Sequence, residues 1–137
     1  MFPYLDNALS ITLPQNAAAI SATTTPTGVN LANAVGPVGL TVAIPSGGSG
    51  TLALQPVMSL NGSSGWISVP ADAILDPVTG LPTTLSNVTS AGAIQTVYLK
   101  RDELYQYVSL TETPTPTASQ TVTLIVLYTR AYTSQAV

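Results

Sequence analysis

Proline and glycine interrupt this chain so often that little room is left for a helix. Eleven prolines and ten glycines are spread over 137 residues, and threonine, valine, leucine and isoleucine fill the short stretches between them. This spacing is typical of many short strands joined by turns, and no helical period of about 3.6 residues persists over a useful window. The pattern predicts an all-β chain, folded as an antiparallel two-sheet sandwich with only short helical turns.

Eight stretches have the composition of strands. Six are expected at 38–44, 51–58, 66–69, 93–99, 104–110 and 120–129, and two shorter ones at 9–13 and 29–31. Apolar residues at alternate positions turn one face of such strands toward a core. The residues expected in that core are Leu40, Val42, Leu54, Val108, Leu124 and Val126. Single helical turns are expected at 16–20 and 71–75, the second ended before Pro77.

Three segments predict turns between strands. The glycine- and serine-rich stretch 46–50 is flanked by two strands that we expect to pair with each other through it. The proline- and threonine-rich stretch 113–117 predicts a hairpin loop between the last two strands. The stretch 100–103 has two cations followed by two acids and predicts a charged turn.

The chain has the usual length of one domain, and no linker or internal repeat divides it. We therefore expect a single β-sandwich domain over residues 1–137, with 1–8 as an N-terminal arm and 130–137 as a C-terminal tail. The first residues lack the basic and apolar regions of a signal peptide, which predicts synthesis in the cytoplasm of a host cell. The longest apolar run, 124–128, is far shorter than the roughly 20 residues of a membrane span, so no membrane partner is expected.

Charged residues are scarce. The chain has three lysines and arginines against six acids, a net charge of −3, and charged residues make up 7% of it. A soluble domain usually has about a quarter, so we expect partners to cover much of this surface. Three cations provide no electrostatic footprint for nucleic acid, which excludes that class of partner.

The residues that most catalytic and metal sites need are missing. The chain has no cysteine and no histidine, which excludes disulfides and removes the commonest general base and metal ligand. Asp72 and Asp76 are four residues apart, but they flank a short turn, where a solvated loop is the simpler interpretation. The run 47–50 lacks the lysine and the helix of a phosphate loop. We therefore expect a protein that is not an enzyme and has no catalytic, cofactor-binding or metal-binding residue.

Apolar and aromatic residues point to a protein interface instead. In the last strand, Ile125 and Leu127 occupy the face opposite the core residues, so a second layer or another subunit must cover them. Tyr105 and Tyr107 share a face, and tyrosine is favoured at interfaces because its ring is broad, rigid and amphipathic. The rim of the sandwich is the alternative place for these two rings.

Two further aromatic features have two interpretations each. The apolar segment 1–5, with Phe2 and Tyr4, is stiffened by a proline and is expected to dock on a partner, or else to tuck under its own sandwich. Trp66 follows the loop 61–65 and is either a core anchor at the start of a strand or a platform for stacking sugars.

The order of the segments along the chain supplies a resemblance. A short lead-in precedes 21–25 and 29–31, and a strand, a glycine-rich turn, 50–55, 66–67, 97–101, 105–110 and 121–128 follow. This layout resembles the small jelly-roll cement proteins that decorate the capsids of some tailed bacteriophages. The resemblance spans about residues 6 to 132 and concerns layout and texture, since such proteins have no catalytic motif to match.

The resemblance implies a structural virion protein that binds the outer surface of a phage head. There it would clamp neighbouring subunits of the major capsid protein and would associate with itself, as a homodimer ahead of a trimer. The stretch 113–117 departs from the pattern, so no contact residue is carried over. The alternative function is a tail, fibre or carbohydrate-binding module that uses Trp66 and the tyrosines on glycans.

Overall fold

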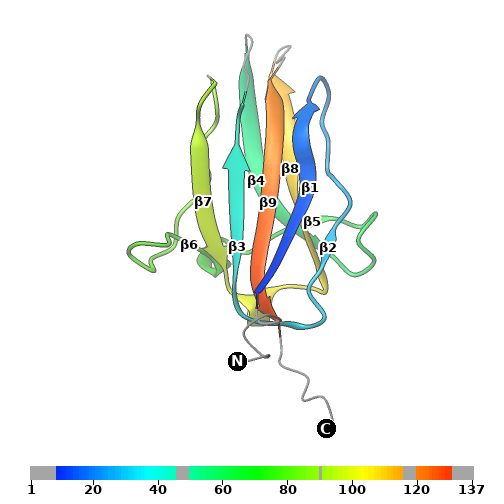
Figure 1. Ribbon diagram of the computed structural model, residues 1–137, viewed down its shortest axis with the longest axis vertical. Coiled ribbons are helices and arrows are strands. Elements are labelled where there is room, and N and C mark those ends of the chain that lie inside the picture. Colours follow the sequence, from blue (N-terminus) through cyan, green and yellow to red (C-terminus); the bar gives the residue numbers. More distant parts are fainter. Residues whose placement is uncertain (1–8, 46–49, 90, 116–119, 131–137) are drawn as a thin grey trace, which may run out of the picture.

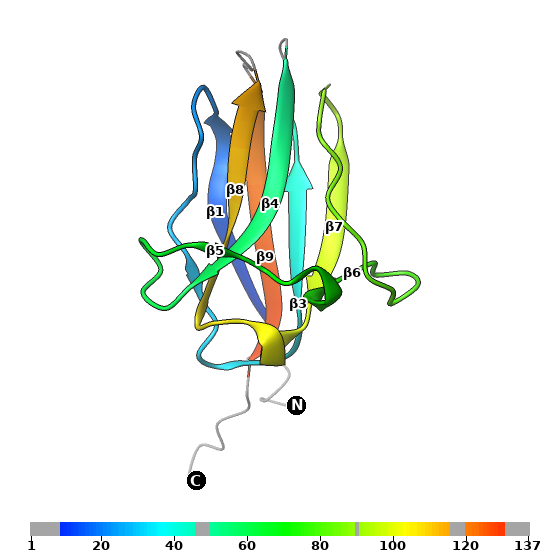
Figure 2. The ribbon, with the colours of Figure 1, turned by 180° about the vertical axis from the view of Figure 1, so that it is seen from behind.

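A computed structural model of the chain describes residues 9–45, 50–89, 91–115 and 120–130, which form two packed β-sheets. In spatial order, the five-stranded sheet consists of β1 (Leu9–Ala19), β9 (Thr121–Arg130), β3 (Ala34–Ala43), β7 (Ile94–Leu99) and β6 (Ile74–Leu75). The four-stranded sheet consists of β2 (Val29–Asn30), β8 (Tyr107–Thr115), β4 (Thr51–Ser59) and β5 (Ile67–Ser68). Figure 1 looks onto the five-stranded sheet, and Figure 2 shows the molecule from the side of the other sheet.

All strand pairs are antiparallel, and two 3-10 turns, η1 (Ala71–Ala73) and η2 (Arg101–Glu103), are the helical elements of the described residues. The predicted fold class, an all-β antiparallel sandwich with only short helical turns, is confirmed. In the part of the chain that is described, no helix has the length and apolar character to cross a membrane.

The strand pairing is nested, so that the first strand pairs with the last. Apart from the two-residue β6, β1 pairs with β9, β2 with β8, β3 with β7 and β4 with β5. This arrangement is a jelly roll, in which β3, β4, β7, β8 and β9 alternate between the two sheets. The start of β1 and the end of β9 therefore lie together at one end of the sandwich, with Leu9 opposite Thr129 (Figure 1).

The core lies between the two sheets and is built from alternate residues of the long strands. On β3, for example, Val38, Leu40 and Val42 are buried while the residues between them are partly exposed. All six residues predicted to be in the core are buried: Leu40, Val42, Leu54, Val108, Leu124 and Val126. The period of two thus identified the inward faces of β3, β4, β8 and β9 correctly.

Two turn predictions are wrong about pairing. The strands on either side of 46–50 are β3 and β4, and those on either side of 113–117 are β8 and β9; in both cases the two strands belong to opposite sheets. Neither β3 and β4 nor β8 and β9 are therefore paired as a hairpin. The physical reason is that both strands of each pair turn an apolar face inward, and facing each other across the core buries both faces.

Three element predictions are corrected in their boundaries. Residues 16–19 belong to β1 and not to a helical turn, and 71–75 is split between η1 and β6. The strand expected at 104–110 begins only at Tyr107, after η2, and it continues to Thr115 through Pro114. On the side of β8 that faces away from β4, the pairing ends at the bridge between Thr24 and Glu112. Pro114 lies past this bridge, so its missing N–H deprives no neighbouring strand of a hydrogen bond.

β1 contains two bulges, and these decide which way its side chains point. Thr12 pairs with Val126 and Gln15 with Leu124, so β1 has one residue more than β9 over this interval. Since successive side chains of a strand alternate between faces, the extra residue moves Gln15 from the outer face to the interior. Gln15 is buried as a result.

The core assignment predicts the effect of shortening a buried side chain. Leu124→Ala should lower the free energy of unfolding by about 2–5 kcal/mol, because it opens a cavity between the sheets. Leu127→Ala, three residues along the same strand but 37% exposed, should change it by only about 0.5 kcal/mol. Urea denaturation of both variants checks this, and equal losses would show that the faces of β9 are assigned wrongly.

Candidate functional site: an uncharged sheet face

The outer face of the five-stranded sheet has apolar side chains open to solvent. The exposed or partly exposed apolar residues that point outward from its four long strands are Leu9, Ile11 and Leu13 on β1, Ile125 and Leu127 on β9, Val35 on β3, and Ile94 and Tyr98 on β7. We call this set the outer face. In Figure 1 these four strands lie side by side and no described segment crosses in front of them.

One row of residues crosses the whole outer face. The strand register places Ile11 opposite Leu127, Leu127 opposite Gly39, and Gly39 opposite Tyr98. Ile11 is 66% exposed and Tyr98 40%. The row therefore continues over β1, β9, β3 and β7 without a charged side chain, and its polar group is the hydroxyl of Tyr98.

Gly39 makes a shallow dip in the middle of this row. A Cβ atom placed on Gly39 would lie 3.6 Å from the Cβ of Leu127 and 3.7 Å from the Cε1 of Tyr98, which are ordinary contact distances. The site thus has room for a side chain but contains none. Leu127 and Tyr98 flank a hollow that a knob on another protein can fill.

No charged residue points outward from the described residues of β1, β9, β3 and β7. Apart from the apolar set, the outward positions include Asn16, Gly39, Ala43 and several threonines, all uncharged. The hydroxyls of Thr41 and Thr96 lie 3.0 Å apart in a hydrogen bond with each other. Exposed apolar patches on monomers usually mark interaction sites. The outer face therefore fits an apolar, uncharged partner surface and offers nothing to hold nucleic acid or an ionic ligand.

The structure brings together only some of the interface residues predicted from sequence. Ile125 and Leu127 lie on the outer face as expected. Tyr107 is on β8 in the other sheet, and Tyr105 lies in the connection before it, so these two residues belong to a different surface. Phe2 and Tyr4 lie outside the described residues.

The β1 and β7 members of the outer face were missed. The alternation at 9–13 was recognised as a strand signal, but a single apolar alternation does not say whether its apolar residues point into the core or away from it. On β1 the apolar side chains of Leu9, Ile11 and Leu13 point away from the core. The inward positions of this strand are held by Thr12 and, after the bulge, by Gln15. Only the pairing of β1 with β9 resolves this choice.

Trp66 and Tyr107 form a second feature, beside Gly28 and Gly62 at the start of β8. Trp66 is partly exposed and does not belong to the buried core, so the expected core anchor is wrong. Both rings pack against glycine backbone. A Cβ on Gly28 would lie 2.7 Å from Cη2 of Trp66, and a Cβ on Gly62 would lie 2.6 Å from the ring of Tyr107. The amide of Gly28 donates a 2.8 Å hydrogen bond to the carbonyl of Gly62, which ties the two segments together.

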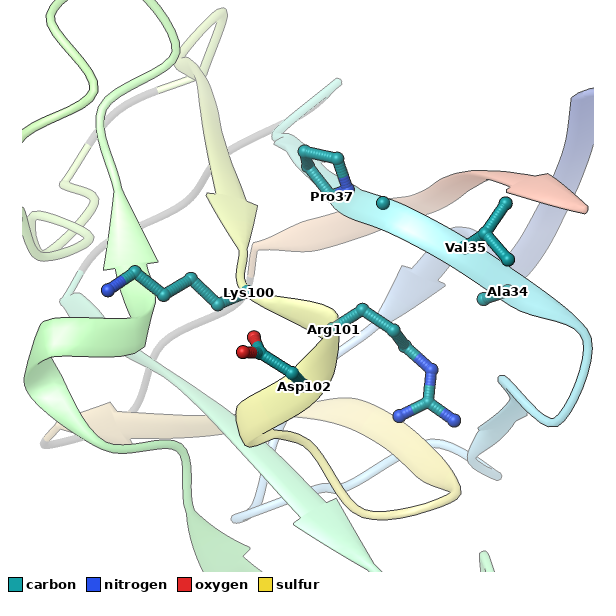
Figure 3. A pocket seen from close by; sticks show the side chains of 7 residues that line it. Ala34, Val35, Pro37, Lys100, Arg101 and Asp102 are labelled. Carbon is teal, nitrogen blue, oxygen red and sulfur yellow. The ribbon is translucent and has the colours of Figure 1, made fainter.

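A groove of about 560 Å³ lies at the end of the sandwich where η2 meets the start of β3. It is lined by residues 34–37 and by Lys100, Arg101 and Asp102 (Figure 3). The guanidinium of Arg101 donates to the carbonyls of Leu31 and Leu104, so this side chain holds the turn in place. Lys100 makes a 3.8 Å ion pair with Glu103, which confirms the charged turn expected at 100–103.

The two aspartates considered as a catalytic pair have separate surroundings. Asp76 accepts hydrogen bonds from the amides of Val78 and Thr79, at 2.8 and 3.0 Å. The hydrogen bonds from the backbone N–H groups of Thr79 and then Val78 hold the pKa of Asp76 below its usual value. This is the behaviour of an ionised side chain that stabilises a turn. Asp72 lies exposed in η1. Among the described residues, no three acids, histidines or cysteines gather where they could hold a metal ion.

Comparisons with known proteins identify the fold and no family. No protein-family model matches the sequence, and no curated protein matches it either. Among solved structures, the SPBc2 prophage-derived protein YomS is similar over 88% of this chain and 92% of its own, with 11% identity and a TM-score of 0.52. A protein of Bacillus endospore appendages (TM-score 0.47, 10% identity) matches over 90% of this chain and 88% of its own. The coat protein of Tobacco streak virus (TM-score 0.35, 9% identity) matches over 95% and 92%.

At these identities the likeness concerns architecture alone. The first comparison shows that this chain and YomS share a β-sandwich fold over nearly their whole lengths. The fold and the outer face together define a class: a jelly-roll domain that presents an uncharged, largely apolar sheet surface.

The close packing at Gly62 is testable. Gly62→Ala should lower the free energy of unfolding by roughly 2–3 kcal/mol, because φ is +80° and the new methyl would collide with Tyr107. Gly65→Ala in the same loop, with φ of +65° and no atom within 4 Å, should lose only about 1 kcal/mol from backbone strain. Thermal denaturation measures both, and equal losses would mean that Tyr107 does not pack on Gly62.

Proposed function

We propose that this protein is a structural virion protein, a capsid decoration or cement protein that binds the outside of a phage head. On this proposal it is made in the host cytoplasm, has no catalytic activity, and binds neither nucleic acid nor membrane. The observation that carries the proposal is the outer face: an apolar, uncharged surface spread over four strands of a jelly roll. The fold shared with YomS, a prophage-derived protein, supports a phage origin.

The physical demands of this role agree with the surface. A protein that binds only the assembled shell stabilises it by mass action, and many copies multiply a modest contact energy. Such a task needs shape complementarity and apolar contact area. The row from Ile11 to Tyr98 and the dip at Gly39 supply both.

We propose the major capsid protein as the partner of the outer face. Self-association, as a homodimer ahead of a trimer, would use the remaining surface around Tyr105 and the edge of the four-stranded sheet. An apolar face left open in solution promotes aggregation, so its permanent cover is expected to be the protein present in greatest number on a head.

A charge in the middle of the outer face tests the docking surface. Gly39→Lys should fold normally, since a Cβ there meets its neighbours at ordinary distances. It should weaken binding to undecorated heads about a hundredfold, because burying an unpaired ammonium costs roughly 3 kcal/mol. Cosedimentation with purified heads measures this affinity.

The matched control is Asn87→Lys, which adds the same charge at an exposed position between β6 and β7, away from the outer face. It should bind like the unaltered protein. Equal binding by Gly39→Lys would reject the outer face as the docking surface. If the unaltered protein fails to bind heads but binds a host glycan, and Trp66→Ala abolishes that binding, the fibre or carbohydrate-module alternative replaces this proposal.

A further inference from the structure

The interior of the sandwich contains a buried carboxyl group, which is not part of the outer face. Glu112 on β8 points between the sheets and is completely buried. Its Oε1 accepts a 2.7 Å hydrogen bond from Nε2 of Gln15, which the bulge of β1 turns inward from the opposite sheet. This hydrogen bond joins an edge strand of one sheet to an inner strand of the other.

Each of the two side chains also has a buried oxygen without a partner. These are Oε1 of Gln15 and Oε2 of Glu112. Both are acceptors if the carboxyl is ionised, and unpaired buried polar atoms are costly. One proton on Oε2 of Glu112 would turn that atom into a donor, and Oε1 of Gln15 is the acceptor on the amide that already faces it.

We propose that Glu112 is protonated in the folded protein and forms a ring of two hydrogen bonds with the amide of Gln15, a latch that holds β1 to the opposite sheet. In this ring Nε2 of Gln15 donates to Oε1 of Glu112, and the carboxylic O–H donates back to Oε1 of Gln15. Loss of the proton breaks the second bond and leaves a buried negative charge. The latch does not depend on what the outer face binds.

The electrostatic surroundings favour the neutral carboxyl. Burial raises the pKa of Glu112 to about 7, against a smaller opposite effect of the bond from Gln15. The elements packed around it, β1, residues 20–28, β3 and β4, contain no titratable residue. The titratable residues on the two remaining elements are Tyr107 on β8, and Tyr128 and Arg130 on β9. Leu124 pairs with Gln15 and marks the level of the carboxyl on β9. Tyr128 and Arg130 lie four and six residues beyond Leu124, so that Tyr128 is roughly 13 Å away along the strand. No described cation therefore faces the carboxyl.

The latch gives stability a definite pH dependence. Below the ordinary value of 4.5, the carboxyl is protonated in the folded and the unfolded chain, and the latch contributes fully. Between there and about 7, the unfolded chain loses its proton while the folded chain keeps it, so the free energy of unfolding falls as pH rises. Above that range both forms are ionised and the fall ends.

Thermal unfolding from about pH 5 to about pH 8 tests the latch. The unaltered protein should lose roughly 5 °C or more in Tm over this range. Glu112→Gln keeps both hydrogen bonds without a titrating proton, so its Tm should stay level and exceed that of the unaltered protein at the upper end. Glu103→Gln, which removes a carboxylate from the surface ion pair with Lys100, should keep the unaltered pH dependence.

A direct titration complements the unfolding data. The side-chain carboxyl carbon of Glu112, followed by NMR in the folded protein, should titrate near neutral pH, at about 7. A level Tm in the unaltered protein, an equal fall in Glu112→Gln, or titration of Glu112 at its ordinary value would each overturn the latch.

Discussion

The pairing of β1 with β9 is the contact on which the rest of this structure depends. It joins the first described strand to the last, and the other long pairs are nested inside it. Closing so long a loop costs chain entropy that no local contact repays, so the core between the sheets must supply the compensation. The same pairing fixes the direction of every side chain on β1, and it thereby creates both the outer face and the buried position of Gln15.

Four of the few charged residues of the chain lie together in the structure. Lys100, Arg101, Asp102 and Glu103 gather in one turn at the end of the sandwich, and Arg101 is occupied with backbone carbonyls. The long strands of the five-stranded sheet are left with an outer face that has apolar and small residues, threonines and Asn16, and no charged residue among the described positions. The low charge of the chain is therefore reflected in one uncharged sheet face, and exposed apolar surfaces of this kind usually mark interaction sites.

Much of the fold could be predicted because strand and core signals are local. Alternation identified the inward faces of β3, β4, β8 and β9, and proline and glycine marked their ends. The turn at 46–50 and the stretch 113–117 misled, because a short turn between two strands is compatible both with a hairpin and with a crossing to the opposite sheet. The candidate site was half found: Ile125 and Leu127 stand next to identified core residues, whereas Ile11 and Tyr98 reveal their direction only through their partners across the sheet.

The sequence by itself determined that this chain is all β, which faces of β3, β4, β8 and β9 are buried, and that it lacks the cysteine and histidine of most catalytic and metal sites. These follow from composition and from a side-chain period of two, which any strand obeys wherever it lies. Only the tertiary structure decided which strands pair, which surface remains uncovered, and that Glu112 meets Gln15 across the core. The physical reason is that these properties depend on contacts between residues far apart in the sequence, such as Gln15 and Glu112, which are 97 positions apart, and on an extra residue in β1 that turns Gln15 inward.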